Sequence, residues 1–427
     1  MRFVVNGHIL ASFAFLGDGR ARLMAIWRFF KEANERAMNT NVDHFDGWIR
    51  GRFVELNSEL EEIYFKQSDR ANVDGVGEAQ KRALMKEGLE FIEALRIEGN
   101  TDEGFDRAFN VLGDLGLLMA ALRRHELTNP AREHKSPFAG ASALGMHIGA
   151  SIGVVPRFAT SHLSTHNFAR NGKPKSFTSL CDERLFLDYN TRGIFAYKRA
   201  ADALMRVVPL GVSHPVAQTL FEDAKEALDD VAKWNDVLFT QLNEDRFFFS
   251  VRPYYKPYRV GRHEYRGANA GDFSGINEID MLTGLCRAND AYYSQILVDK
   301  MLFMRPEDQA SLRDCMRRRD FLDIFLEMLP AAANELWFQE NARAFLAVCD
   351  AHARAAEQHH NMLVTRFIEK PSVALDESKL SQVTASGPPL PVLLNSLSIL
   401  RDLRMAAARP DLLTRHDDIK MLRDAVS

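Results

Sequence analysis

Apolar residues recur at intervals of three and four along almost the whole chain, and no convincing series of alternating apolar and polar residues is present. A period of three to four residues is typical of amphipathic helices, whereas alternation is typical of strands. The spacing predicts helices near residues 20–38, 43–65, 80–97, 102–125, 181–209, 214–246, 273–287, 290–304, 307–329 and 332–370, with a helical tail to about Leu422. The chain is therefore predicted to be all-α.

Polar and breaker-rich segments separate these helices. Loops are expected at 68–78 and 171–179, and a linker at 381–391. Residues 143–153 are expected to form a short helix, and Thr101 is the expected N-cap of the helix over 102–125. In the segment after 247, Pro253 and Pro257 exclude a long helix.

Composition narrows the function classes. With 427 residues and 46% hydrophobic content, the chain can bury a large core in one or two domains. A net charge of −4 argues against a broad nucleic-acid or anionic-membrane surface. The four cysteines lie far apart without metal-site spacing, as in reduced cytosolic proteins, and no apolar run reaches membrane-spanning length. We expect a soluble, cytoplasmic protein.

The most informative helix runs from Phe345 to Pro371 and has one apolar face with His360 in its middle. The proline is expected to end this helix. Burying an imidazole is costly unless both ring nitrogens find partners. Taken alone, the pattern is more typical of a hydrogen-bonded core histidine than of a metal ligand.

A second histidine pair, His162 and His166, is spaced to share one face if residues 161–167 are helical. Two histidines at this spacing can hold a metal ion. Without a third ligand nearby, polar residues lining a cavity or an interface are the more usual interpretation.

Residues 246–280 are rich in aromatic residues and arginine, and then in small residues. Gly267, Ala268, Ala270 and Gly271 would let the backbone approach a flat, bulky group closely. An ordinary loop in which arginine and tyrosine stack on each other accounts for the same composition equally well.

Several stretches together resemble the indoleamine/tryptophan 2,3-dioxygenase superfamily, and within it the monodechloroaminopyrrolnitrin synthases. They are RPYYKPYRVGRHEYRGANA (252–270), NAGDFSGINEIDMLTG (269–284), HNMLVTRFIEKP (360–371) and RAFNVLGDLGLLMAALRRH (107–125), with the region 155–167. The resemblance runs from about residue 104 to 407. It implies a helical bundle enclosing haem b over 101–427, preceded by extra N-terminal helices over 1–100.

The resemblance also implies roles around the haem. His360 matches the proximal ligand, which would bind iron through Nε2, and Asp280 matches the acid that orients such a ligand. His359 is the main competitor for the ligand role, but in an α-helix it would point about 100° away. The loop over the haem face would comprise Gly267, Ala268, Asn269, Ala270 and Gly271.

Arg252 resembles the distal arginine that pairs with a substrate carboxylate through two parallel hydrogen bonds. If a catalytic imidazole is needed, His162 or His166 would supply it. Further substrate contacts are expected from residues in the helix after Cys181, in the aromatic segment and in a TASG loop: Phe186, Tyr189, Asn190, Tyr254, Thr384, Ser386 and Gly387.

The function that the resemblance implies is a haem-dependent oxygenase. It would act on a tryptophan-derived or related aromatic amino-acid-like substrate, using O₂ or peroxide, in the biosynthesis of a specialised metabolite. Two alternatives remain open at this point: a non-catalytic haem sensor or carrier, and a haem-free all-α interaction protein. No nucleic-acid or membrane partner is expected, and both a monomer and a homodimer are compatible with the sequence.

Overall fold

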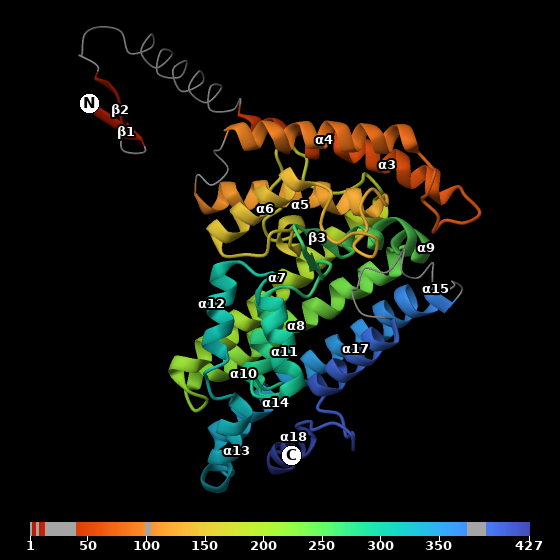
Figure 1. Cartoon of the computed structure of the whole chain (residues 1–427). Helices are drawn as coiled ribbons and strands as arrows, with labels where there is room; N and C mark the ends of the chain where they lie inside the picture. Colours follow the sequence, from red (N-terminus) through yellow and green to blue (C-terminus); the bar gives the residue numbers. More distant parts are fainter. Residues whose placement is uncertain (1, 6–7, 13–39, 99–103, 374–389) are drawn as a thin grey trace.

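A computed structural model describes residues 2–5, 8–12, 40–98, 104–373 and 390–427. Helices dominate it, which confirms the predicted all-α fold (Figure 1). Within those ranges the strands form two short antiparallel hairpins, β1 (Arg2–Val5) with β2 (His8–Ser12) and β3 (Tyr258–Val260) with β4 (His263–Tyr265). None of the helices in those ranges combines the length and the apolar character that a bilayer span requires.

The first group of helices comprises α2 (Asn41–Ile49), α3 (Arg52–Phe65), α4 (Glu78–Glu98), α5 (Phe105–Arg124) and α6 (Ala139–Ile152). In Figure 1, α3 and α4 form a layer over α5 and α6. Helix α5 is apolar almost all round and is buried nearly along its whole length, as expected for a central helix. Phe45 of α2 and Phe109 of α5 belong to one hydrophobic cluster, so helices on both sides of residue 100 share a core. The domain boundary at residue 100 stays a prediction.

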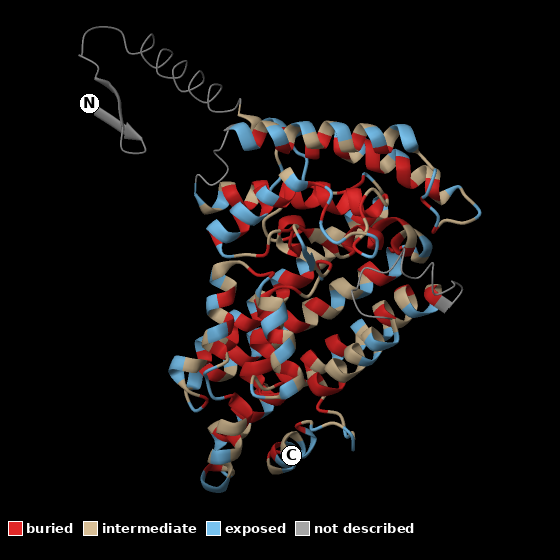
Figure 2. Cartoon of the chain, viewed as in Figure 1, coloured by how far each residue is buried: buried red, intermediate tan, exposed pale blue. Residues whose placement is uncertain are grey.

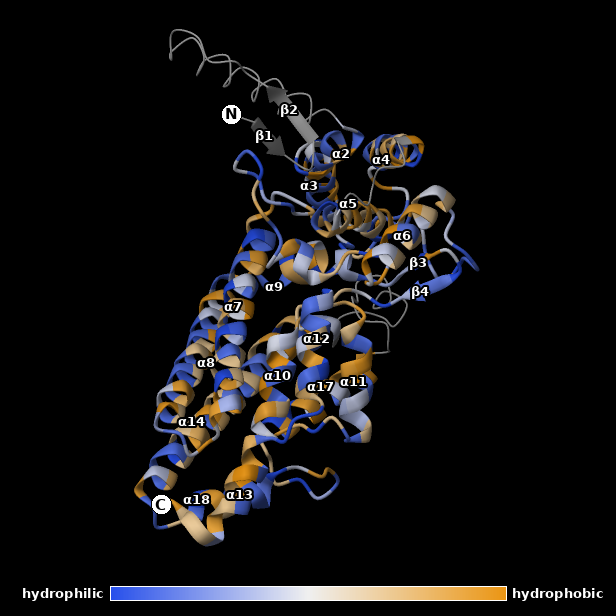
Figure 3. Ribbon diagram, turned by 90° about the vertical axis from the view of Figure 1, so that its left-hand side faces the viewer, coloured by the Kyte–Doolittle hydropathy of each residue, from blue (hydrophilic) through white to orange (hydrophobic). Residues whose placement is uncertain are grey.

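The second group is built on α7 (Cys181–Leu210), α8 (Pro215–Gln241) and α14 (Leu336–Gln358), which run side by side (Figure 3). Around them pack α10 (Ser274–Thr283), α11 (Ala291–Met301), α12 (Pro306–Cys315), α13 (Phe321–Ala332), α17 (Leu390–Arg404) and α18 (His416–Ala425). Their apolar faces form a second cluster, whose members include Phe221, Phe325 and Phe345. Figure 2 shows the buried residues concentrated where these helices face one another.

Several predicted helices differ from those observed. The helix expected over 43–65 is interrupted between α2 and α3 at Gly51, and the one expected over 307–329 is two helices, the second capped by Asp320. Asp320 accepts a hydrogen bond from the Asp323 amide, which satisfies one free donor of a new helix start. Pro371 does not end the last long helix, because α15 (Lys370–Val373) continues through it. The expected helix at 20–38 and the expected N-cap Thr101 lie outside the described residues.

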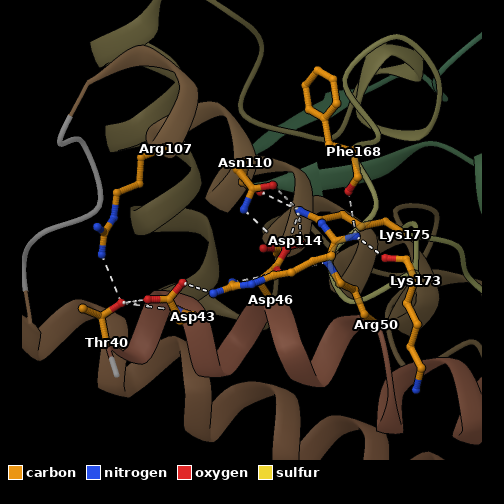
Figure 4. A network of polar contacts seen from close by, with 11 residues as sticks. Thr40, Asp43, Asp46, Arg50, Arg107, Asn110, Asp114, Phe168, Lys173 and Lys175 are labelled. Atoms are coloured by element: carbon orange, nitrogen blue, oxygen red, sulfur yellow. Dashed lines mark hydrogen bonds and ion pairs between the residues drawn. The ribbon is translucent and has the colours of Figure 1, made fainter. Parts of the chain in front are cut away.

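A buried ionic network joins the segment before α7 to the first group (Figure 4). The Lys175 ammonium pairs with Asp114 of α5 and lies 3.2 Å from Asp46 of α2. It also donates to the Asn110 side chain at 2.6 Å. Burial raises the pKa of Asp114 to about 7, although Lys175 opposes the shift. The network holds residues 167–175 against α2 and α5, and so fixes one side of the segment that leads into the site.

Candidate active site

A cavity of about 270 Å³ lies between the two groups of helices. Its lining comes from both hydrophobic clusters: Phe247, Tyr255 and Ala268 belong to the first, while Tyr197 and Leu400 pack against the second. Most of the lining is apolar, with a few polar groups among it. That composition is typical of a site that orients a small organic ligand.

The sharpest local feature of the lining is a π-helical segment, η4 (His359–Glu369), that continues α14. Such segments are rare and frequently occur at functional sites. Because its turns are wider than those of an α-helix, neighbouring residues are rotated less. Both His359 and His360 line the cavity, so His359 stays a competitor for the ligand role.

His360 is not a satisfied core residue, and His359 is exposed where it lines the cavity. Nδ1 of His360 is buried and has no hydrogen-bond partner among the described residues. Burial, and then the charge of Arg401, lowers the pKa of His360. Desolvation of its ring by the surrounding protein, followed by the charge of Arg404, lowers the pKa of His359 to about 4. Both rings are therefore neutral near pH 7, the form in which an imidazole binds a metal ion.

Arg252 brings an unpaired cation to the same cavity. It lies in the short 3₁₀-helix η3 (Arg252–Tyr255) and is 5% exposed, and neither Nη1 nor Nη2 has a hydrogen-bond partner in the described ranges. Burial lowers its pKa to about 10, so it stays charged near neutral pH. Burying an uncompensated guanidinium is unfavourable, and a ligand carboxylate would satisfy it.

The small-residue loop also reaches the cavity, through Ala268, Asn269, Ala270 and Gly271; Gly267 is not part of the lining. Asp272 holds this loop in place. Its carboxylate accepts two hydrogen bonds from Arg266, both 2.9 Å long, and one from the Asn269 amide at 2.7 Å. The loop is thus shaped before any ligand arrives.

Three cations besides Arg252 line the cavity: Lys300, Arg401 and Arg404. They come from segments far apart in sequence, α11 and α17. Burial and the neighbouring Arg404 lower the pKa of Lys300 to about 8. A group of positive charges on one cavity suits a ligand with carboxylates.

Asp280 corrects one prediction, because it does not contact His360. Its carboxylate is fully buried and accepts hydrogen bonds from His352 Nε2 at 2.7 Å, Tyr293 Oη at 2.6 Å and Arg404 Nη2 at 2.7 Å. Those groups occupy the oxygens that would otherwise orient the His360 ring. Asp280 reaches the cavity only through Arg404, which lines it.

The substrate contacts expected from α7 and η3 are partly brought together. Phe186 and Asn190 line the cavity. Tyr189 does not, and its ring lies 6.1 Å from that of Trp234. Tyr254 does not either, because its hydroxyl donates to Asn57 at 3.3 Å in the first hydrophobic cluster. Thr384, Ser386 and Gly387 lie outside the described residues.

The two candidate catalytic imidazoles are not in the cavity lining. The segment that carries them forms only a 3₁₀ turn, η1 (Thr160–Leu163), so His162 and His166 do not share a helical face. His162 Nε2 lies 2.8 Å from the Phe109 carbonyl oxygen, and Nδ1 accepts from the Ala159 amide at 2.9 Å. With both nitrogens used, His162 is a core histidine and cannot supply a catalytic imidazole as placed here.

Sequence reasoning missed several polar groups of the lining, among them Tyr255, Lys300, Arg401 and Arg404. The three-residue spacing between Arg252 and Tyr255 was a usable signal once a 3₁₀ turn is considered, because residues three apart are eclipsed in that helix. No local pattern marked Lys300 or Arg404. They reach the cavity only because α11 and α17 pack next to it.

A sequence model of the family described as monodechloroaminopyrrolnitrin synthase PrnB matches residues 39–426. The chain belongs to the PrnB family. This confirms the resemblance noted from the motifs. The match begins at residue 39 and spans all the residues that line the cavity, from Thr160 to Arg404. PrnB-family proteins are haem-dependent oxygenases that act in biosynthesis on a tryptophan-derived substrate.

Proposed function

We propose that this PrnB-family protein is an oxygenase that binds haem b in the cavity through His360 and acts on a tryptophan-derived or related aromatic amino-acid-like substrate. The observation that carries the proposal is that His360 lines the cavity and neither of its ring nitrogens has a hydrogen-bond partner among the described residues, so Nε2 is free to bind iron. A structural histidine would be hydrogen-bonded, as His162 is. When bound, the haem supplies the activation of O₂ or peroxide.

The residues present fit such a group. The loop of Ala268, Asn269, Ala270 and Gly271 carries few side-chain atoms toward the cavity, which leaves room for a flat macrocycle. Lys300 offers positive charge for one of its propionates, and Arg401 and Arg404, which pair with Asp402 and Asp280, add guanidinium donors beside it. We assign them, with His360, to cofactor binding.

The remaining polar groups suit an aromatic amino acid. Arg252 would bind the substrate carboxylate through Nη1 and Nη2, which have no hydrogen-bond partner in the described part of the chain. Phe186 would contact the aromatic ring, and Asn190 offers a side-chain amide beside it. These contacts orient the substrate, and its bulk together with the apolar lining excludes water from the reacting face.

A non-catalytic haem carrier is the second candidate function. It would need the His360 side of the cavity but would have no use for a buried, unpaired arginine. Arg252 therefore favours the oxygenase, because burying a charge destabilises the protein unless a ligand of opposite charge binds to it.

The test is an absorption titration of the haem-reconstituted protein beside the matched variants His360→Ala and His359→Ala. We expect the Soret band of the wild type to be lost in His360→Ala, regained on adding free imidazole, and kept in His359→Ala. L-tryptophan should shift the wild-type band. Equal haem uptake by all three proteins, or by none, would overturn the assignment, and loss only in His359→Ala would move the ligand role to that residue.

A further inference from the structure

Tyr255 places a second unsatisfied polar group in the cavity. Its side chain is 7% exposed and lines the cavity, and its hydroxyl is buried without a hydrogen-bond partner among the described residues. Buried tyrosine hydroxyls usually find a partner. An unused donor beside a ligand cavity points to a bond that forms only when the ligand is present.

The backbone places this hydroxyl on the same side as Arg252. Both belong to the 3₁₀-helix η3, in which side chains three positions apart are eclipsed. Pro253 at the start of this turn and Pro257 just after it keep it from continuing as an α-helix. Tyr254, one position earlier, points its hydroxyl at Asn57 instead.

Three aromatic rings hold the Tyr255 ring in place. Phe158, Phe177 and Phe186 surround it with ring centroids 5.9, 6.0 and 5.9 Å away, each near an edge-to-face arrangement. Burial, and then the charge of Glu183, raises the pKa of Tyr255 well above its ordinary value. The phenol is therefore neutral and keeps a proton to donate.

We propose that the Tyr255 hydroxyl donates a hydrogen bond to the substrate carboxylate that Arg252 binds, which makes Tyr255 a positioning and specificity-determining residue. The inference rests on the proposed function. A carboxylate has about four acceptor positions, and a bidentate arginine uses two of them. The phenol takes a third, so the carboxylate is fixed in direction as well as in place. A site built in this way rejects ligands that lack the carboxylate.

The chain offers a matched pair of variants, Tyr255→Phe and Tyr254→Phe, each removing one hydroxyl oxygen from adjacent residues. The haem-reconstituted proteins are titrated with L-tryptophan and with tryptamine, which lacks the carboxylate, and Kd is read from the Soret shift. For Tyr255→Phe we expect the Kd of L-tryptophan to rise about ten-fold, because one charge-assisted hydrogen bond is lost. The Kd of tryptamine should not change, and Tyr254→Phe should bind both ligands as the wild type does.

Different outcomes separate this inference from the proposed function. If L-tryptophan does not shift the wild-type band, the proposed function fails first. If the wild type responds but Tyr255→Phe binds L-tryptophan equally well, or loses both ligands in parallel, the role of Tyr255 is refuted and the function stands. Should Tyr255→Phe fail to fold, 3-fluorotyrosine at position 255 replaces it. Its more acidic phenol is a better donor, so L-tryptophan alone should bind more tightly, and unchanged binding would refute the role.

Discussion

His352 Nε2 lies 2.7 Å from Asp280 Oδ1, and both side chains are completely buried. Asp280 also pairs with Arg404, whose Nη2 lies 2.7 Å from Oδ2. Burial opposes ionisation of this carboxyl, but Arg404 and His352 outweigh it and hold the pKa of Asp280 well below its ordinary value. Asp280 thus links α10 to His352 of α14 and to Arg404 of α17, and it holds Arg404 in the cavity lining.

Asp280→Asn should therefore destabilise the protein strongly. Removing one member of a buried charge pair leaves Arg404 uncompensated, at a cost of about 3–5 kcal/mol. Urea denaturation at pH 7 measures the change in the free energy of unfolding. Asp411→Asn is the control, because it removes a surface carboxylate that pairs with Arg409 and should change little. Similar decreases in the free energy of unfolding of both variants would show that the buried Asp280 network stabilises the protein no more than a surface ion pair does.

Replacing Arg252 should separate stability from binding. Arg252→Met removes a buried charge whose Nη1 and Nη2 have no hydrogen-bond partner in the described ranges, so the free energy of unfolding of the haem-free protein should rise by about 1–3 kcal/mol. The Soret response to L-tryptophan should be lost at the same time. Arg124→Met is the matched comparison, since this arginine is equally buried but bonded to Glu61 at 2.8 and 2.9 Å. Arg124→Met should lower the free energy of unfolding. A lower free energy of unfolding in both variants would contradict the idea that Arg252 is unsatisfied until a ligand binds.

His162 predicts a pH dependence. Burial, and next the charge of Lys175, lowers its pKa from 6.5 to about 3. Between pH 6.5 and pH 3 the imidazole is protonated in the unfolded chain but neutral in the folded protein. The contribution of His162 to the free energy of unfolding is therefore complete above pH 6.5 and falls as the pH drops toward 3. His162→Asn removes this titration. Relative to the variant, the wild type should lose about 2 kcal/mol between pH 7.5 and pH 5. Parallel stability curves would argue against a neutral, buried His162.

Gly116 predicts a packing defect. A Cβ atom there would lie 2.2 Å from the Phe158 amide nitrogen, and a backbone atom cannot move aside easily. Gly116→Ala should cost about 1–3 kcal/mol or more, because α5 would be forced away from the segment around Phe158. Gly47→Ala serves as the control: nothing lies within 4 Å of its Cβ position on the exposed side of α2, so it should be neutral or stabilising. Thermal unfolding of the two variants distinguishes clash from propensity.

Much of the fold was predictable because helical periodicity is a local property. The helix observed at Cys181–Leu210 was expected at 181–209, and that at Glu78–Glu98 at 80–97. The predicted helices were wrong where tertiary contacts compete with the local helix propensity. The π-helical turn at His359 widens the helix beside the cavity, and Pro371, which was expected to end the helix, is accommodated inside it.

For the site, the sequence by itself determined which chemical groups were available and, through the order of its motifs, the family. Arg252, His360 and the small-residue loop were singled out through the motifs that resemble the family, and all three contribute to the cavity lining. Only the tertiary structure decided which groups meet. It turned Tyr255 and not Tyr254 toward the cavity, paired Asp280 with His352, and brought Lys300 and Arg404 into the cavity lining. The physical reason is that local periodicity sets the face of a helix, whereas a cavity is enclosed by contacts between helices far apart in the chain.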